Sequence, residues 1–255
     1  MVENIELERF LDALMQSHRF KDYAPNGLQV EGKEKIYRLA AATSASLQVV
    51  EKAIEWGAEA LLVHHGWFWQ NEEIRLTGAY RLKIEKTLGA RLNIFAYHLP
   101  LDALPLYGNN EPVLTSLGCE NIELFEEIGF MGFYPEPLTA SSYIESINRY
   151  YDFEATHIIP GDKTEIKGIA VVSGDGTSFF RKAITHNRLN PVKKIDAFIT
   201  GESTEWIYSL AKENSIAYSA IGHNRSEEVG PALLGRHLAE KFKLEFFFIK
   251  EDNPF

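Results

Sequence analysis

The sequence predicts an α/β protein made of two similar lobes with mostly parallel or mixed sheets. Short apolar runs alternate with amphipathic helical patterns, which is typical of strands joined by crossover helices. The alternation occurs twice, and the turn-and-helix segments 43–54 and 173–184 both end in Lys-Ala-Ile. The 255 residues suffice for two ordinary domains, so we expect lobes at 1–126 and 127–255, related by an internal duplication.

The first lobe is predicted to begin with an amphipathic helix and to continue with strands that alternate with helices. Pro25 and the Asn-Gly pair that follows it separate the first helix from the first short strand. Gly57 is expected to end a later helix. The predicted segments are a helix at 5–18, a strand within 22–32, a strand at 36–46, a helix at 46–58, and strands at 59–65 and 91–98.

The second lobe repeats this rhythm. Its predicted segments are a helix at 141–151, an extended segment at 153–159, a strand at 166–176, a helix at 178–187, a strand at 195–203, a helix at 204–214 and a strand at 215–223. Glycine and proline gather at 126–140, where we expect the crossover between the lobes.

Composition and charge exclude several classes of protein. The acidic N-terminus does not resemble a secretory signal, and no apolar run approaches the length of a membrane span. Cys119 is the single cysteine, which excludes an intrachain disulfide and a thiolate metal cage. A net charge of −10 disfavours binding to a phosphate backbone. We therefore expect a cytoplasmic protein with no membrane or nucleic-acid partner.

Polar side chains follow several of the apolar strands. His64 and His65 end one strand of the first lobe. After a later strand of each lobe, a histidine precedes a carboxylate by four positions, and the pairs are His98 with Asp102 and His223 with Glu227. Ligands of open parallel sheets bind beyond the carboxyl ends of the strands. The pattern therefore predicts a site in the cleft between the lobes.

The donor types in this pattern suit transition metals. Three imidazoles and two carboxylates match zinc, iron, manganese or nickel, and they exceed what one tetrahedral catalytic ion needs. The set suits two divalent ions, which lower the pKa of a water between them and leave a local positive charge for an anionic substrate. The predicted ligands are His64, His65, Asp102, His223 and Glu227.

Each predicted ligand also has a purely structural interpretation. His64 and His65 suit ordinary strand-end histidines, Asp102 suits a turn cap, and Glu227 suits a side chain near a helix N-terminus. His98 is either a further ligand or an acid–base group, and we favour the second role. The aromatic side chains after His65 suit either core packing or stacking on a heterocycle.

The chain is similar to the GTP cyclohydrolase 1 type 2 homologues, also called Ngg-interacting-factor-three-like proteins. The segments that carry the resemblance are "DYAPNGLQVEG", "LLVHHGWFW", "AYHLPLDALPLYGNN", "AFITGE" and "AIGHNRSEE". The resemblance implies intertwined α/β lobes, a ring-shaped (toroidal) homohexamer and a dinuclear metal centre with the five ligands given above. Glu227 is implied as the bridging ligand.

The resemblance also implies a reaction. The family name points to hydrolytic opening of the guanine imidazole ring of GTP, in which His98 or Glu202 would move protons. A metal-dependent hydrolase acting on another small anionic or nucleotide-like substrate ranks above that assignment. The alternative is a metal-binding or regulatory assembly protein without turnover. A panel of substrates tested with the metal-loaded protein distinguishes these classes.

Overall fold

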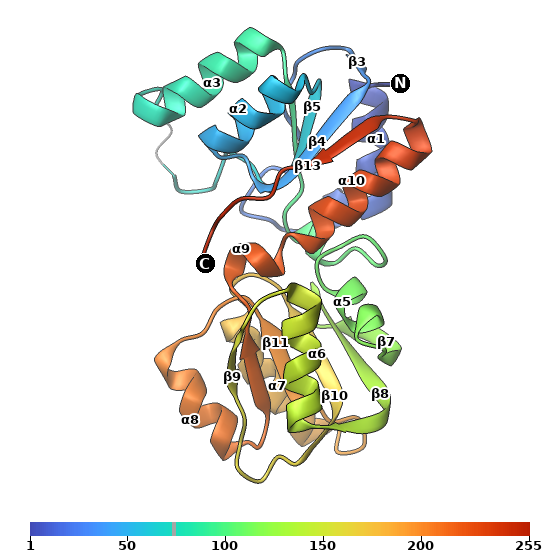
Figure 1. The fold of residues 1–255 in the computed structure, drawn as a ribbon, viewed down its shortest axis with the longest axis vertical. Coiled ribbons are helices and arrows are strands. Elements are labelled where there is room, and N and C mark those ends of the chain that lie inside the picture. Colours follow the sequence, from blue (N-terminus) through green and yellow to red (C-terminus); the bar gives the residue numbers. More distant parts are fainter. Residues whose placement is uncertain (73–74) are drawn as a thin grey trace. The chain divides into compact units, whose positions relative to one another are not determined.

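A computed structural model describes residues 1–72 and 75–255 of the chain (Figure 1). The chain forms two compact units, each with its own sheet and helices. Unit 1 comprises residues 1–101 and 230–252, and unit 2 comprises residues 102–229 and 253–255. Over the residues that the structure describes, no helix combines the length and the apolar character that a bilayer span requires.

Unit 1 contains a five-stranded sheet of order β13-β4-β5-β6-β2. Its strands are parallel except β2, which runs antiparallel to β6. A separate antiparallel pair joins β1 to β3. The elements are β1 (Val2–Glu3), α1 (Asn4–Met15), the 3₁₀ turn η1 (Ser17–Arg19), β2 (Gly27–Val30), β3 (Lys35–Ile36), β4 (Arg38–Ser44), α2 (Leu47–Trp56), β5 (Ala60–His65), α3 (Gly78–Ala90), β6 (Asn93–Ala96), α4 (Leu99–Asp102), α10 (Val229–Phe242) and β13 (Glu245–Phe248).

The core of unit 1 lies on both faces of this sheet because the central strands β4, β5 and β6 are buried along most of their length. On one face, the buried side chains of α2 pack on alternate residues of β4 and β5, such as Ala42 and Val63. On the other face, Gly235 of α10 lies so close to Phe246 that an added Cβ would be 2.3 Å from that ring. Ser46 caps α2 by accepting from the Val49 amide at 3.2 Å.

Unit 2 contains a six-stranded sheet of order β7-β8-β10-β11-β12-β9. The three strands β10, β11 and β12 are parallel, and β7, β8 and β9 pair antiparallel. The elements are α5 (Glu111–Ser116), β7 (Glu120–Phe125), β8 (Gly129–Thr139), α6 (Ala140–Tyr151), β9 (Thr156–Ile158), β10 (Glu165–Val172), α7 (Thr177–Leu189), β11 (Ala197–Thr200), α8 (Glu205–Glu213), β12 (Ala217–Ala220) and α9 (His223–Ser226).

Two apolar clusters cover the two faces of this second sheet. Tyr143 and Ile147 of α6 belong to the cluster on one face. Phe180 of α7 and Ile207 of α8 belong to the cluster on the other. Alternate residues of the parallel strands supply the rest of each cluster, as the two-residue period of a strand requires. The predicted α/β fold with parallel and mixed sheets is confirmed.

The two units repeat one topology. The order α1–β2–β4–α2–β5–α3–β6 in unit 1, apart from the short β3, corresponds to α6–β9–β10–α7–β11–α8–β12 in unit 2. Segments 43–54 and 173–184 occupy the same place, because each runs from the end of its first parallel strand into the helix that follows. The repeat that the shared Lys-Ala-Ile indicates is therefore present in the topology.

The second sequence correspondence is displaced by one residue. The amide of Tyr97 donates to a β5 carbonyl at 3.1 Å, and the amide of Ile221 donates to the corresponding β11 carbonyl at 2.9 Å. Tyr97 and Ile221 are therefore equivalent, and so are His98 and Gly222. His223 lies one residue further along the chain, so the two histidines do not hold the same position in the two sheets.

The structure also differs from the predicted boundaries. β7 belongs to the second sheet, and β13 pairs with β4 in the first, so the compact units divide the chain differently from the lobes predicted at 1–126 and 127–255. The segment 126–140, where the crossover between the lobes is predicted, lies within unit 2, and β8 fills most of it. Pro135 and Pro137 are tolerated there because they fall where the ladder to β10 shifts register.

Candidate metal centre

Unit 1 brings three histidines together at the carboxyl ends of β5 and β6. The rings of His64 and His65 are 4.6 Å apart between centroids, and the ring of His98 is 4.9 Å from that of His64. One nitrogen of each ring lies within 4.8 Å of the others. His64 is fully buried and His98 is 7% exposed. Three imidazoles at this separation form a nitrogen donor set of the kind that binds transition metals.

Hydrogen bonds through Nδ1 orient all three rings. His64 Nδ1 lies 3.1 Å from the Tyr97 carbonyl oxygen, so it must carry the proton and the lone pair is on Nε2. His65 Nδ1 contacts the Ser44 hydroxyl at 3.1 Å. Such contacts to the opposite nitrogen hold a metal-binding ring in place, and the carbonyl contact also sets the tautomer of His64.

Asp22 orients the third ring and is a residue that the sequence reasoning missed. Its Oδ1 lies 2.9 Å from His98 Nδ1, and its Oδ2 accepts from the Leu99 amide at 3.0 Å. Burial raises the pKa of Asp22, but the hydrogen bonds and the charge of His98 outweigh it and lower the pKa to about 2. Asp22 lies in the turn "DYAPNG", far from His98 in sequence, so no local spacing could have identified the pair.

Unit 2 holds the first predicted carboxylate in a buried network. Asp102 is 4% exposed, and its Oδ1 accepts from Asn109 Nδ2 and from Ser173 Oγ, each at 2.8 Å. The Asn110 amide donates to the backbone oxygen of Asp102 at 3.2 Å. These bonds fix the plane of the carboxylate, as expected for an oxygen ligand, and they exceed what a simple turn cap would need.

The segment "SGDG" places the second predicted carboxylate. Gly174 has φ of 61°, and a Cβ built on it would lie 2.2 Å from Oε1 of Glu227. Glycine is therefore required at this position for two reasons, the backbone conformation and the close approach of the Glu227 carboxylate. Ser226 Oγ accepts from the Gly174 amide at 2.9 Å and joins the two segments. No local spacing in the sequence connects this turn with Glu227, which lies about fifty residues further along the chain.

His223 lies between two carboxylates of unit 2. Its Nε2 is 3.3 Å from Glu227 Oε2, and its Nδ1 is 2.5 Å from Glu202 Oε1. The hydrogen bond to Glu227 and the charges of both carboxylates outweigh burial and raise the pKa of His223 to about 9. Divalent metal would take the place of the proton that this environment otherwise attracts. Glu202, predicted to move protons, is thus in direct contact with a predicted ligand.

Each unit has a cavity beside its donors. In unit 1 a cavity of about 370 Å³ is lined by Asp22, Tyr23, Phe68 and Trp69 among others. The rings of Tyr23 and Trp69 meet that of His98 edge-on, at 4.9 and 5.2 Å between centroids. In unit 2 a cavity of about 530 Å³ is bounded by Phe153, Thr156, Gly201, Glu202, Ser203, Ala220, Gly222, His223, Pro254 and Phe255. Both volumes fall in the range of small-molecule sites.

The structure therefore groups the predicted residues by unit. His64, His65 and His98 cluster in unit 1. Asp102, Glu202, His223 and Glu227 belong to unit 2, where His223 contacts both glutamates. His98 lies in the same cluster as two predicted ligands. This position suits both roles predicted for it, a further metal ligand and an acid–base group. The supporting residues Asp22, Asn109, Ser173 and Gly174 become visible only in the fold.

Comparison with known proteins gives a consistent result along the whole chain. A sequence model of Duf34/NIF3 (NGG1p interacting factor 3) matches residues 2–254. The chain is 34% identical over 253 residues to a GTP cyclohydrolase 1 type 2 homolog of Yersinia pestis, covering 99% of this chain and 100% of that protein. It is 36% identical over 258 residues to the protein of the same name from Allochromatium vinosum, covering 100% and 98%.

Solved structures show the same fold. One described as protein ybgI, of unknown function, has a TM-score of 0.91 at 32% identity and covers 100% of both chains. TTHA1606 from Thermus thermophilus has a TM-score of 0.90 at 26% identity, again with 100% of both chains covered.

Proposed function

This chain belongs to the Duf34/NIF3 family, and on that premise we propose that it is a metal-dependent hydrolase of a small anionic or nucleotide-like substrate. The proposed cofactor is a pair of divalent ions, which are zinc, iron, manganese or nickel. The proposed ligands are His64, His65, Asp102, His223 and Glu227, with Glu227 as the bridge.

The observation that carries this proposal is the way the protein already holds the donor groups. The two predicted histidine ligands of unit 1 each engage Nδ1 with a neighbouring oxygen, and Asp102 is held through one carboxylate oxygen by two donors. Ordinary strand-end histidines would not need to lie in one cluster with fixed ring planes. The donor set is nitrogen and oxygen only, which suits the proposed metals.

The chain's own residues supply the remaining parts of a hydrolytic site. Bound divalent ions would polarise the scissile bond and lower the pKa of an attacking water. His98, oriented by Asp22, is the proposed acid–base group on unit 1. Glu202, in contact with His223, is the proposed proton acceptor on unit 2. Both groups lie beside a cavity that admits a small molecule.

The aromatic side chains of unit 1 favour a nucleotide-like substrate. Tyr23 is 51% exposed, and its ring lies 5.8 Å from that of Trp69 with a tilt of 34°. Their loops are joined by a hydrogen bond from the Gln70 amide to the Tyr23 carbonyl, at 2.7 Å. A planar base can stack on such rings, which contributes about 1–3 kcal/mol per base in nucleic-acid complexes. The positive charge of bound metal would hold a phosphate.

A homohexameric ring and a cytoplasmic location are also proposed, on the resemblance to the family. Light scattering of the purified protein tests the first, because a ring of six chains has a mass that no dimer or trimer shares.

The direct test combines metal analysis with substrate turnover. We expect about two equivalents of transition metal per chain, and a loss of loading in His64→Ala of unit 1 and in Glu227→Ala of unit 2. The loaded protein would then be assayed with GTP for formate and pterin, and with phosphate esters and cyclic amides. Metal in the wild type without turnover of any substrate would favour the non-enzymatic assembly protein. No metal after reloading would contradict both.

A further inference from the structure

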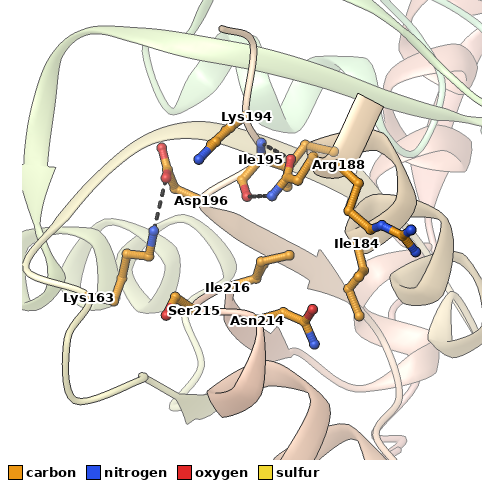
Figure 2. A pocket seen from close by; sticks show the side chains of 10 residues that line it. Lys163, Ile184, Arg188, Lys194, Ile195, Asp196, Asn214, Ser215 and Ile216 are labelled. Carbon is orange, nitrogen blue, oxygen red and sulfur yellow. Dashed lines mark hydrogen bonds and ion pairs between the residues drawn. The ribbon is translucent and has the colours of Figure 1, made fainter. Parts of the chain in front are cut away.

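Unit 2 carries a second cavity (Figure 2), which encloses about 210 Å³. It lies at the amino ends of the parallel strands, whereas the candidate metal ligands of this unit lie beyond their carboxyl ends. Its lining residues come from the approaches to β10, β11 and β12 and from the last turns of α7. They are Lys163, Ile184, Asn187, Arg188, Lys194, Ile195, Asp196, Asn214, Ser215 and Ile216.

The charges that line this cavity are mostly positive. Three cations accompany one carboxylate, that of Asp196. Its Oδ1 pairs with Lys163 Nζ at 3.0 Å, and its Oδ2 accepts from the amides of Lys167 and Gly168 at 3.0 and 2.9 Å. The one acidic group of the lining is therefore already neutralised by the protein.

The two other cations have no such counterpart. Within residues 1–72 and 75–255, neither Arg188 nor Lys194 forms an ion pair with a carboxylate. Both side chains are exposed. Figure 2 shows Lys194 near Asp196 and Arg188 on the side of Ile184, so that they flank the cavity. On a chain of net charge −10, two neighbouring cations without acidic partners form a local positive site.

Ile184 supplies the accessible aliphatic surface of the cavity, because it is half-buried, whereas Ile195 and Ile216 are each 1% exposed. The polar groups of the lining are held by hydrogen bonds. Asn187 makes two 2.7 Å hydrogen bonds with the backbone of Ile195, drawn in Figure 2. The Ser215 hydroxyl is turned toward Asp162, outside the lining. The cations are therefore the main recognition groups, above an apolar surface.

We propose that this cavity binds a small oxyanion that carries a short aliphatic part, with Arg188 and Lys194 on its charged group and Ile184 against its apolar part. A volume near 210 Å³ is below that of drug-sized sites, so the ligand is small. Arginine offers two parallel donors to a carboxylate or phosphate, and lysine adds a point charge. The proposal does not depend on the metal centre.

A simpler role for Arg188 is to offset the negative end of α7, in whose last turn it lies. That role predicts a change in stability without ligand and no change in anion affinity. The proposed role predicts the reverse, so calorimetric titration distinguishes them. The probes are butyrate, acetate and inorganic phosphate.

We expect saturable binding of butyrate to the wild type, and weaker binding of acetate because it lacks the aliphatic part. The R188Q/K194Q double variant should lose about tenfold in affinity, ~1.4 kcal/mol. The control is K182Q/K193Q, which removes the same charge from lysines that pair with Glu126 and Glu123 at the surface. Both variants change exposed side chains, so folding should be retained.

The binding measurements distinguish the proposed site from a general charge effect. Equal weakening in both double variants would show a general charge effect and overturn the site, as would the absence of saturable binding of all three probes. Phosphate bound more tightly than butyrate, with the same dependence on Arg188 and Lys194, would keep the oxyanion site but overturn the role of Ile184.

Discussion

The two units share a topology but offer different chemistry at the carboxyl ends of their strands. Unit 1 contributes imidazole nitrogens, held by a carbonyl, a hydroxyl and a carboxylate. Unit 2 contributes carboxylates, held by an amide, a hydroxyl and close contact with a glycine, together with one imidazole. A repeated fold thus carries two unlike donor sets. The scaffold sets where side chains can meet, and individual residues set what they do.

The comparison also shows how tightly each unit fixes its donors. In unit 1, one contact to Nδ1 orients each ring, from a backbone carbonyl, the Ser44 hydroxyl or the Asp22 carboxylate. In unit 2, the turn 173–176 serves both carboxylates, because Ser173 binds Asp102 and Gly174 admits Glu227. We therefore expect unit 2 to be more sensitive to changes in one short segment.

The largest expected effect is that of Gly174→Ala. The added methyl group would require positive φ from alanine, which costs about 1–2 kcal/mol, and would displace the Glu227 carboxylate. We expect metal affinity to fall by about 100-fold, which isothermal titration with zinc would measure. Gly161→Ala is the control, since nothing lies within 4 Å of its added Cβ. Equal metal affinity in both variants would break the proposed role of the turn.

Asp22→Asn should have the next largest effect, in unit 1. The variant loses the charge that pairs with His98, and we expect a loss of about 2 kcal/mol in the free energy of unfolding at pH 7. The pKa of Asp22 is lowered from 3.8 to about 2 in the folded protein, so its contribution is present above pH 4 and is lost as the pH falls toward 2. Denaturant unfolding across this range measures it.

A parallel acid profile for wild type and Asp22→Asn would contradict this assignment. A lower metal affinity of the same variant would place His98 among the ligands of unit 1. Unchanged metal affinity with reduced turnover would support its acid–base role.

Ser173→Ala removes one of the two donors to Asp102. We expect metal affinity to fall by about tenfold, which is the lower end of the effect of removing a hydrogen bond behind a ligand. Ser178→Ala, an exposed serine of α7, is the matched control. If both serine variants bind zinc as the wild type does, the Asn109 bond alone holds the carboxylate.

The smallest effect is a shift in the titration of His223 in the metal-free protein. Its pKa is raised from 6.5 to about 9, so the stability it contributes is present below pH 6.5 and is lost as the pH rises through 9. Glu202→Gln removes one of the two carboxylates and should lower this pKa. Two-dimensional NMR of the imidazole protons measures the shift, and an unchanged titration would contradict the contact between the two side chains.

Much of the fold follows from local patterns. Alternating apolar runs and helical periodicity placed nearly every parallel strand and the helices α1, α2, α6, α7 and α8. The glycines and prolines of the segment 126–140 indicate a crossover because they are typical turn residues. In the fold, pairing with β7 on one side and β10 on the other makes most of this segment a strand. The sequence also does not predict the pairing of β13, because β13 joins a sheet whose other strands lie far away in sequence.

The donor types and their places after strands follow from residue identity and hydrophobic pattern alone. The groups that support these donors come from distant parts of the chain, so they emerge only when the chain is folded. Asp22 reaches His98, Ser173 reaches Asp102 and Gly174 makes room for Glu227 through long-range packing. The fold also shows that His98 and His223 are one residue out of register, because strand pairing, and not the spacing of residues along the chain, sets equivalence between the units.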